Sequence, residues 1–296
     1  MRTALRNSLA ALVVGAVVAV PVSVASAGDD RRGGGGQGNG QGNGQGNGQG
    51  RALDAVGLVA GTSLVSVRTS DGRVRDQRPV TGLTGDRRLV GIDHRVQDGL
   101  LYGVGDAGGV YTLARDGRAT EVTRLTVPLA GTSFGVDFNP AANALRVVSD
   151  TGQNLRQPFA TPGAPTVADG TLAYTPGTPA AGITAAGYTN NDLDPATATT
   201  LFDLDTTLDQ VAVQSPANAG SLAPTGRTGV DAVGDAGLDV YSTVRDGSTV
   251  DLTAFAVLTV DGDPGLYSIA LLTGRATLLG DLDRPLSDIA VPLAQR

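Results

Sequence analysis

Residues 88–124 read RLVGIDHRVQDGLLYGVGDAGGVYTLARDGRATEVTR, and this stretch holds the unit from which the fold is predicted. Many of its apolar residues recur at every second position, which places them on one face of a strand. Asp98-Gly99 and Asp116-Gly117 separate such runs and indicate hairpin turns, because Gly adopts φ > 0 without steric penalty. The stretch predicts four short strands: Leu89–Asp93, Leu100–Val104, Gly109–Ala114 and Ala119–Thr123.

The same plan recurs along the chain in residues 132–170, 182–226 and 230–283. These three units contain the predicted strands Ser133–Phe138, Ala144–Ser149, Asn154–Gln157, Thr166–Ala168, Ile183–Tyr188, Thr200–Asp205, Asp209–Gln214, Leu222–Thr225, Leu238–Tyr241, Thr253–Val260, Leu266–Leu271 and Ala276–Leu279. Four further strands lie outside the units: Gly57–Ala60, Ser63–Arg68, Val74–Pro79 and Ser287–Leu293. Three of these precede the units and one follows them, so together they complete a fifth unit.

This repeat predicts an all-β protein with a five-bladed β-propeller, closed by pairing of its N- and C-terminal strands. The spacing of the aspartates in the first strands supports the repeat, since Asp93, Asp137, Asp239 and Asp288 are 44, 102 and 49 residues apart. The middle gap equals two steps of 51, and its midpoint falls in the strand Ile183–Tyr188. A β-sandwich of two sheets is the alternative, but it explains neither the repeat nor the divided fifth unit.

Residues 1–27 have the features of a cleaved signal peptide: Arg2 and Arg6, an apolar run of 12 residues, and the small-residue site Ala25-Ser26-Ala27. An uncleaved anchor is the alternative, but a membrane span needs roughly 18–20 residues. Residues 28–51 are rich in Gly, Gln and Asn and predict a disordered linker, since they contain no apolar side chain to bury before Ala52. We therefore expect a propeller domain at 52–296, exported to the extracellular space or the cell envelope, with no membrane span after cleavage.

The composition excludes several kinds of chemistry. The 296 residues include one His, no Cys and no Lys, which excludes the usual zinc sites, disulfides, thiol nucleophiles, Schiff bases and P-loops. The net charge is −7, and it becomes −9 when Arg2 and Arg6 are removed with the signal peptide. An acidic protein of this kind is a poor partner for nucleic acid or an anionic membrane. We expect a monomer whose partner is a protein, a glycan or a small ligand.

No catalytic residue is predicted. A Ser–His–Asp triad would need His94, the single His, with Ser133 or Ser149, but Asp93 precedes His94 directly and adjacent strand residues point to opposite faces. We expect His94 to pack between blades. Four pairs of aspartates two residues apart are interpreted as turn formers and solvated edges: Asp192/Asp194, Asp203/Asp205, Asp261/Asp263 and Asp281/Asp283. Activity stays open at this point, with a non-catalytic role favoured.

Four aspartates are candidate metal ligands. Asp93, Asp137, Asp239 and Asp288 come from four different units and would converge near the propeller axis. Ca²⁺ binds six to eight oxygen ligands, and converging carboxylates repel each other unless they are neutralised. The alternative is that each aspartate accepts backbone N–H groups of the next strand. No other cofactor is predicted, and the sequence leaves open whether these aspartates bind Ca²⁺.

Several strings carry a resemblance to a known family: LVGIDHR, GTSFGVDFNP, LRVVSDTGQNLR, GITAAGYTN, TTLFDLDTTLDQVAVQSPANAGSL and GLYSIALLTGRATLLG. The chain resembles, over residues 57–283, the bacterial exported family known as domain of unknown function 4394. The run at 150–156, DTGQNLR, is its most distinctive piece. The resemblance implies a propeller-like secreted or cell-surface protein, without an activity or catalytic residues. His94 departs from the aromatic residue expected at its position by analogy with Phe138.

Three functions agree with these observations. A secreted binding or scaffolding module is favoured, because the chain has the architecture of a platform and lacks evident nucleophiles and bases. A Ca²⁺-dependent propeller hydrolase of lactonase-like plan and a structural component of the envelope are the alternatives.

Overall fold

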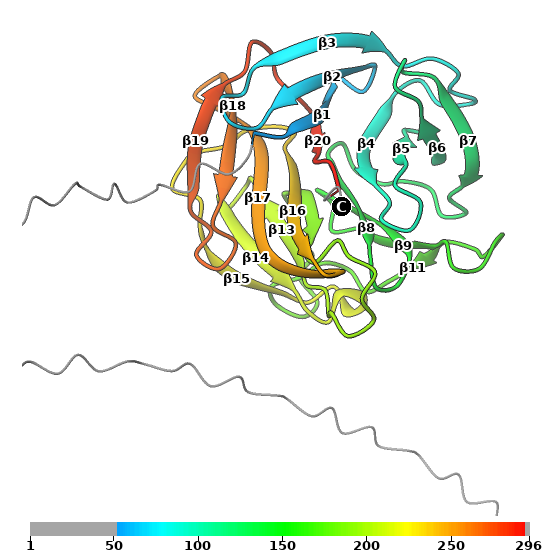
Figure 1. The fold of residues 1–296 in the computed structure, drawn as a ribbon. Coiled ribbons are helices and arrows are strands. Elements are labelled where there is room, and N and C mark those ends of the chain that lie inside the picture. Colours follow the sequence, from blue (N-terminus) through cyan, green and yellow to red (C-terminus); the bar gives the residue numbers. More distant parts are fainter. Residues whose placement is uncertain (1–51, 294–296) are drawn as a thin grey trace, which may run out of the picture. The chain divides into compact units, whose positions relative to one another are not determined.

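A computed structural model describes residues 52–293, so the predicted signal peptide and linker lie outside the described residues. The described residues form five four-stranded antiparallel sheets, which confirms the all-β, five-bladed propeller. Figure 1 shows the sheets arranged as blades around a common centre. The innermost strands of neighbouring blades contact one another around the whole ring.

Each blade is a meander in which consecutive strands pair from the centre outward. Blade II contains β4 (Leu89–His94), β5 (Leu101–Gly105), β6 (Gly109–Leu113) and β7 (Ala119–Arg124). Blade III contains β8 (Phe134–Asn139), β9 (Ala144–Ser149), β10 (Asn154–Pro158) and β11 (Val167–Ala168). Blade IV contains β12 (Ile183–Tyr188), β13 (Leu201–Asp205), β14 (Gln210–Gln214) and β15 (Leu222–Arg227). Blade V contains β16 (Gly237–Arg245), β17 (Ser248–Val260), β18 (Asp263–Ile269) and β19 (Ala276–Asp281).

Blade I closes the ring from both ends of the described chain. It contains β20 (Asp288–Ala290), β1 (Asp54–Val59), β2 (Ser63–Arg68) and β3 (Val74–Pro79), in that order from the centre. The strands β1 and β20 are antiparallel, with Gly57 opposite Ile289. The divided fifth unit that the sequence predicts is therefore confirmed.

Among residues 52–293 the hydrophobic core consists of five clusters, and each one lies between two neighbouring blades. Between blades II and III, for example, Tyr102, Phe138 and Phe159 pack edge to face with ring centroids 5.1–5.5 Å apart. Each blade buries side chains on both of its faces, so adjacent blades stabilise each other. Most residues of the inner strands are consequently buried.

Blade V differs from the prediction because its first two strands are longer than the apolar pattern indicates. Their hairpin turns at Asp246 and Gly247, whose φ values of 52° and 87° suit a two-residue turn. The outer end of the hairpin carries polar residues and is held by the loop after β12, where Asp192 accepts hydrogen bonds from Thr249 and Asp194 accepts one from Ser248. The only helix among residues 52–293 is a three-residue 3₁₀ turn, so no helix there is long and apolar enough to cross a membrane.

Candidate functional site

The four predicted axial aspartates lie on innermost strands: Asp93 on β4, Asp137 on β8, Asp239 on β16 and Asp288 on β20. All four are buried. One carboxylate oxygen from each of Asp93, Asp137 and Asp239 lies within 4.8 Å of the others. Asp288 does not join this group within the same distance. The structure therefore brings three of the four predicted residues together.

Blade IV contributes no carboxylate to the axis. On β12, Gly187 occupies the position that corresponds to these aspartates. It pairs with Phe202 on the second strand of its blade, just as Asp239 on β16 pairs with Phe255 on the second strand of blade V. The spacing of the aspartates in the sequence predicted the corresponding residue of blade IV at position 188, one residue after Gly187.

Three of the aspartates accept backbone N–H groups from two strands, as the capping interpretation expects. The Asp93 carboxylate accepts the N–H groups of His94 and Phe138, the latter at 2.7 Å. Asp239 accepts those of Val240 and Val291, and Asp288 accepts those of Ile289 and Ile92. Each carboxylate thus links its own strand to a neighbouring blade.

Asp137 is the exception. Its side chain is 1% exposed, and neither carboxylate oxygen has a hydrogen-bond partner. The N–H of Tyr188 faces this carboxylate and lowers its pKa without reaching hydrogen-bond geometry. Burial and the negative charges of Asp93 and Asp239 have a larger effect than this N–H group. Together they raise the pKa of Asp137 well above its usual value. Burial likewise raises the pKa of Asp239 to about 7.

A glycine precedes three of these aspartates by two positions, on the same face of the strand. A Cβ at Gly91 would lie 2.4 Å from Cγ2 of Val136, and a Cβ at Gly135 would lie 2.5 Å from the backbone N of Ala186. A Cβ at Gly237 would lie 2.6 Å from Cα of Asp288. Glycine therefore lets the inner strands approach closely. The repeated Gly-x-Asp pattern is a sharper sequence signal for the axis than the aspartates alone.

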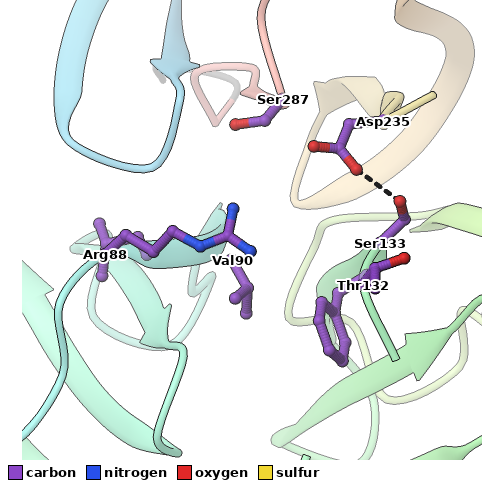
Figure 2. Close-up of a pocket in the computed structure, with 8 residues that line it drawn as sticks. Arg88, Val90, Thr132, Ser133, Asp235 and Ser287 are labelled. Atoms are coloured by element: carbon purple, nitrogen blue, oxygen red, sulfur yellow. Dashed lines mark hydrogen bonds between the residues drawn. The ribbon is translucent and has the colours of Figure 1, made fainter. Parts of the chain in front are cut away.

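A small hollow opens on the axis where β4, β8 and β20 begin. We call this hollow the mouth. The lining residues labelled in Figure 2 are Arg88, Val90, Thr132, Ser133, Asp235 and Ser287, and Leu89 and Phe134 also line it. It has a volume of about 10 Å³, room for roughly one water molecule. Val90 and Phe134 precede Asp93 and Asp137 by three residues, so the aspartates lie roughly 10 Å deeper along the axis.

The distinctive 150–156 run holds one side of the mouth. The Asp150 carboxylate accepts hydrogen bonds from the backbone N–H and the hydroxyl of Thr132. Gln153 accepts the N–H of Ala130 and donates to the carbonyl of Pro128. Sequence reasoning missed this role, because the partners are 18–25 residues away from the run.

A larger cavity lies at the same end of the blades, beside blade IV. It has a volume of about 170 Å³ and is lined by Tyr174, Thr175, Thr178, Pro179, Ala180, Ala181, Asp205, Thr207 and Leu208. The Tyr174 hydroxyl donates to the Asp205 carboxylate at 2.9 Å, and the N–H groups of Thr207 and Leu208 donate to its other oxygen. Burial raises the pKa of Tyr174, so its hydroxyl keeps its proton at neutral pH.

The solvated-edge interpretation was wrong for Asp203 and Asp205, which are both 0% exposed. Asp205 does form a turn, as expected, but it does so inside the fold. The solvated-edge interpretation was also wrong for Asp192, which is buried against the β16–β17 hairpin. The exposed pairs Asp261/Asp263 and Asp281/Asp283 agree with the interpretation.

The candidate triad does not assemble. Ser133 and Ser149 lie at the end of blade III where β8 begins, whereas His94 is the last residue of β4, five residues beyond the mouth end of that strand. The Ser133 hydroxyl donates to Asp235, and that of Ser149 donates to the carbonyl of Ala130. Burial lowers the pKa of His94 to about 4, which makes its imidazole a weak base.

Comparison with known proteins gives a family and a set of distant structural likenesses. The sequence profile of domain of unknown function 4394 matches residues 63–290. A search of curated proteins returned no match.

Three solved structures illustrate the likenesses. A nidogen–laminin complex is 10% identical with a TM-score of 0.46, covering 83% of this chain and 87% of that one. A Bacteroides thetaiotaomicron protein of unknown function is 14% identical with a TM-score of 0.42, covering 83% and 68%. An auxiliary nutrient binding protein from the same bacterium is 12% identical with a TM-score of 0.38, and the match covers 79% of this chain and 53% of that one. Similarities at this level carry no functional argument.

Proposed function

Since the chain belongs to the family of domain of unknown function 4394, which is defined without an activity, we propose a function from the site itself: an exported, non-catalytic binding module. Its ligand docks on the face of the propeller that carries the mouth and the larger cavity. Export is part of this proposal and is supported by the signal-peptide features of residues 1–27.

The cavity of about 170 Å³ is the observation that carries the proposal. Its walls combine small apolar side chains with a few hydroxyl groups, which is the usual make-up of a small-ligand site. Cavities of roughly 150 Å³ hold a single benzene-sized ring. The proposed ligand is therefore a group of about the size of one six-membered ring, held by apolar contact and by hydrogen bonds to threonine hydroxyls.

The chemistry of the cavity favours binding over catalysis. Its two titratable groups, Tyr174 and Asp205, bond to each other, and the raised pKa of Tyr174 makes it a poor proton donor to a substrate. A lactonase-like hydrolase would need a metal that substrate can reach, whereas the axial aspartates are at most 5% exposed. The hydrolase is therefore the weaker alternative.

The test is a ligand screen by saturation-transfer-difference NMR, with monosaccharides and single-ring aromatic acids as probes. We expect at least one probe to bind the wild-type protein and to lose binding in Ala181→Phe, which fills the cavity. Ala142→Phe is the matched control, because Ala142 is exposed in the turn between β8 and β9, at the opposite end of the blades. Binding that survives Ala181→Phe would contradict the proposed site, and turnover of an ester or lactone would contradict the non-catalytic role.

A further inference from the structure

We propose that Asp93, Asp137 and Asp239 bind one Ca²⁺ ion on the propeller axis, where the ion joins the innermost strands of blades II, III and V. This site is separate from the ligand cavity beside blade IV, and its role is to stabilise the closed ring.

The spacing of the oxygen atoms fits calcium. One carboxylate oxygen from each residue lies within 4.8 Å of the other two. Ligands on opposite sides of Ca²⁺ are roughly 4.6–5.2 Å apart, since each Ca–O distance is roughly 2.3–2.6 Å. Mg²⁺ usually keeps several of its own waters, so a buried cage of protein oxygens suits Ca²⁺ better. Oxygens at this spacing are therefore close enough to one another to share one Ca²⁺.

The orphaned carboxylate of Asp137 is an independent sign of a ligand. A buried polar group without a partner costs free energy, and a buried charge costs more. Asp137 is 1% exposed, yet neither of its oxygens accepts a hydrogen bond. Backbone capping explains Asp93 and Asp239, whereas at Asp137 the facing N–H of Tyr188 does not reach hydrogen-bond geometry. A cation beside it would give these oxygens the partner that they lack.

The charge balance of the axis points the same way. None of the ion pairs among residues 52–293 involves an axial aspartate, so no arginine neutralises the cluster. The backbone N–H groups occupy one lone pair on each oxygen of Asp93 and Asp239, and the second lone pair is left for a metal. Hard oxygen donors without nitrogen or sulfur are the ligand set that Ca²⁺ prefers.

The decisive measurement is the calcium content and thermal stability of the full-length chain. The protein is stripped with EDTA, dialysed against CaCl₂ and then against metal-free buffer, and analysed by inductively coupled plasma mass spectrometry. We expect one Ca²⁺ per chain and a melting temperature that rises with added Ca²⁺ and falls back with EDTA. A wild-type protein that retains no Ca²⁺ and melts at the same temperature with Ca²⁺ or EDTA would overturn the proposal. So would an equal response to Mg²⁺.

Two variants separate the axial site from other acidic groups. Asp137→Asn keeps the side-chain shape and is expected to lose both the bound Ca²⁺ and the shift in melting temperature. Asp203→Asn is the matched control, because Asp203 is equally buried and unpartnered but lies on β13, outside the three-residue group. Retention of Ca²⁺ by Asp137→Asn would overturn the assignment. If Asp137→Asn does not fold, the calcium content of the wild-type protein alone decides whether the chain binds Ca²⁺.

Discussion

Asp203 is the single residue that differs most from its sequence-based interpretation. Alternation along β13 correctly places it on the same face as Leu201 and Asp205, opposite Phe202 and Leu204. The structure buries that face as well, and neither oxygen of Asp203 has a hydrogen-bond partner. Burial raises its pKa to about 8, although the nearby Arg146 charge acts in the opposite direction.

This raised pKa predicts a pH dependence of stability. The folded state holds the Asp203 proton more tightly than the unfolded state, whose pKa is about 3.9. The stabilising contribution is therefore complete below about pH 4 and is lost as the pH rises toward 8, by up to ~1.4 kcal/mol per pH unit. Urea unfolding of Asp203→Asn at pH 5, 6, 7 and 8 should show a flatter loss of stability than the wild type. The exposed Asp246→Asn serves as control, and equal slopes for Asp203→Asn and wild type would refute the prediction.

A second residue-scale prediction concerns Phe202, on the opposite face of the same strand. It is 6% exposed and belongs to the cluster between blades IV and V. Truncation removes buried area and leaves a cavity, so Phe202→Ala should lower the free energy of unfolding by about 3–5 kcal/mol. Val250→Ala, at a 55% exposed position, should cost far less in the same denaturation experiment. Similar losses for the two variants would mean that this cluster is not tightly packed.

At the scale of the element, close packing of the inner strands depends on glycine. A Cβ on Gly135 of β8 would meet the backbone of β12 at 2.5 Å, and backbone atoms yield less than a flexible side chain. Gly135→Ala should therefore destabilise the protein by about 1–3 kcal/mol. Gly187→Ala is the matched control, because a Cβ there would lie no closer than 3.3 Å to any neighbouring atom, the nearest being Cγ2 of Val240. Thermal denaturation measures which variant is less stable. A larger drop in melting temperature for Gly187→Ala than for Gly135→Ala would contradict the prediction.

The strand boundaries show where the local pattern is informative. The strands Ser63–Arg68, Val74–Pro79, Ala144–Ser149 and Ile183–Tyr188 agree with the prediction at both ends. The outer half of the β16–β17 hairpin was missed, because its residues at 244–252 include many polar side chains and lack a buried face. That part depends on hydrogen bonds that Ser248 and Thr249 donate to Asp194 and Asp192, which the local sequence does not reveal.

At the scale of the whole molecule, stability depends on closure of the ring. Deletion of Ser287–Arg296 removes β20, exposes the inner edge of β1 and takes away the Asp288 link to Ile92 and the Val291 link to Asp239. We expect the truncated protein to unfold or aggregate, since an open strand edge invites pairing with other chains. Circular dichroism and size-exclusion chromatography check this outcome. A truncated monomer that melts like the full-length protein would show that closure is dispensable.

Removal of residues 28–51 is the complementary change. These residues precede the first strand and carry no apolar side chain for the core, so their deletion should leave the melting temperature of the propeller unchanged. A clear drop in melting temperature would mean that the segment contacts the folded domain.

The sequence by itself determined the number of strands, their grouping into five units and the closure between the two ends of the domain. These features follow from alternation and from Asp-Gly turns, which act over a few residues, and from their repetition. The sequence also placed four aspartates on innermost strands, and three of them, Asp93, Asp137 and Asp239, meet at the axis.

Only the tertiary structure decided what those residues experience. It brought Asp93, Asp137 and Asp239 together, left Asp137 without a partner and buried Asp203. It also placed the cavity beside Asp205 and set Asp150 against Thr132 at the mouth. The physical reason is that burial, hydrogen-bond satisfaction and pKa depend on atoms from other strands and from neighbouring blades. Those atoms are 18 to almost 200 residues away in the chain, beyond the reach of any local pattern.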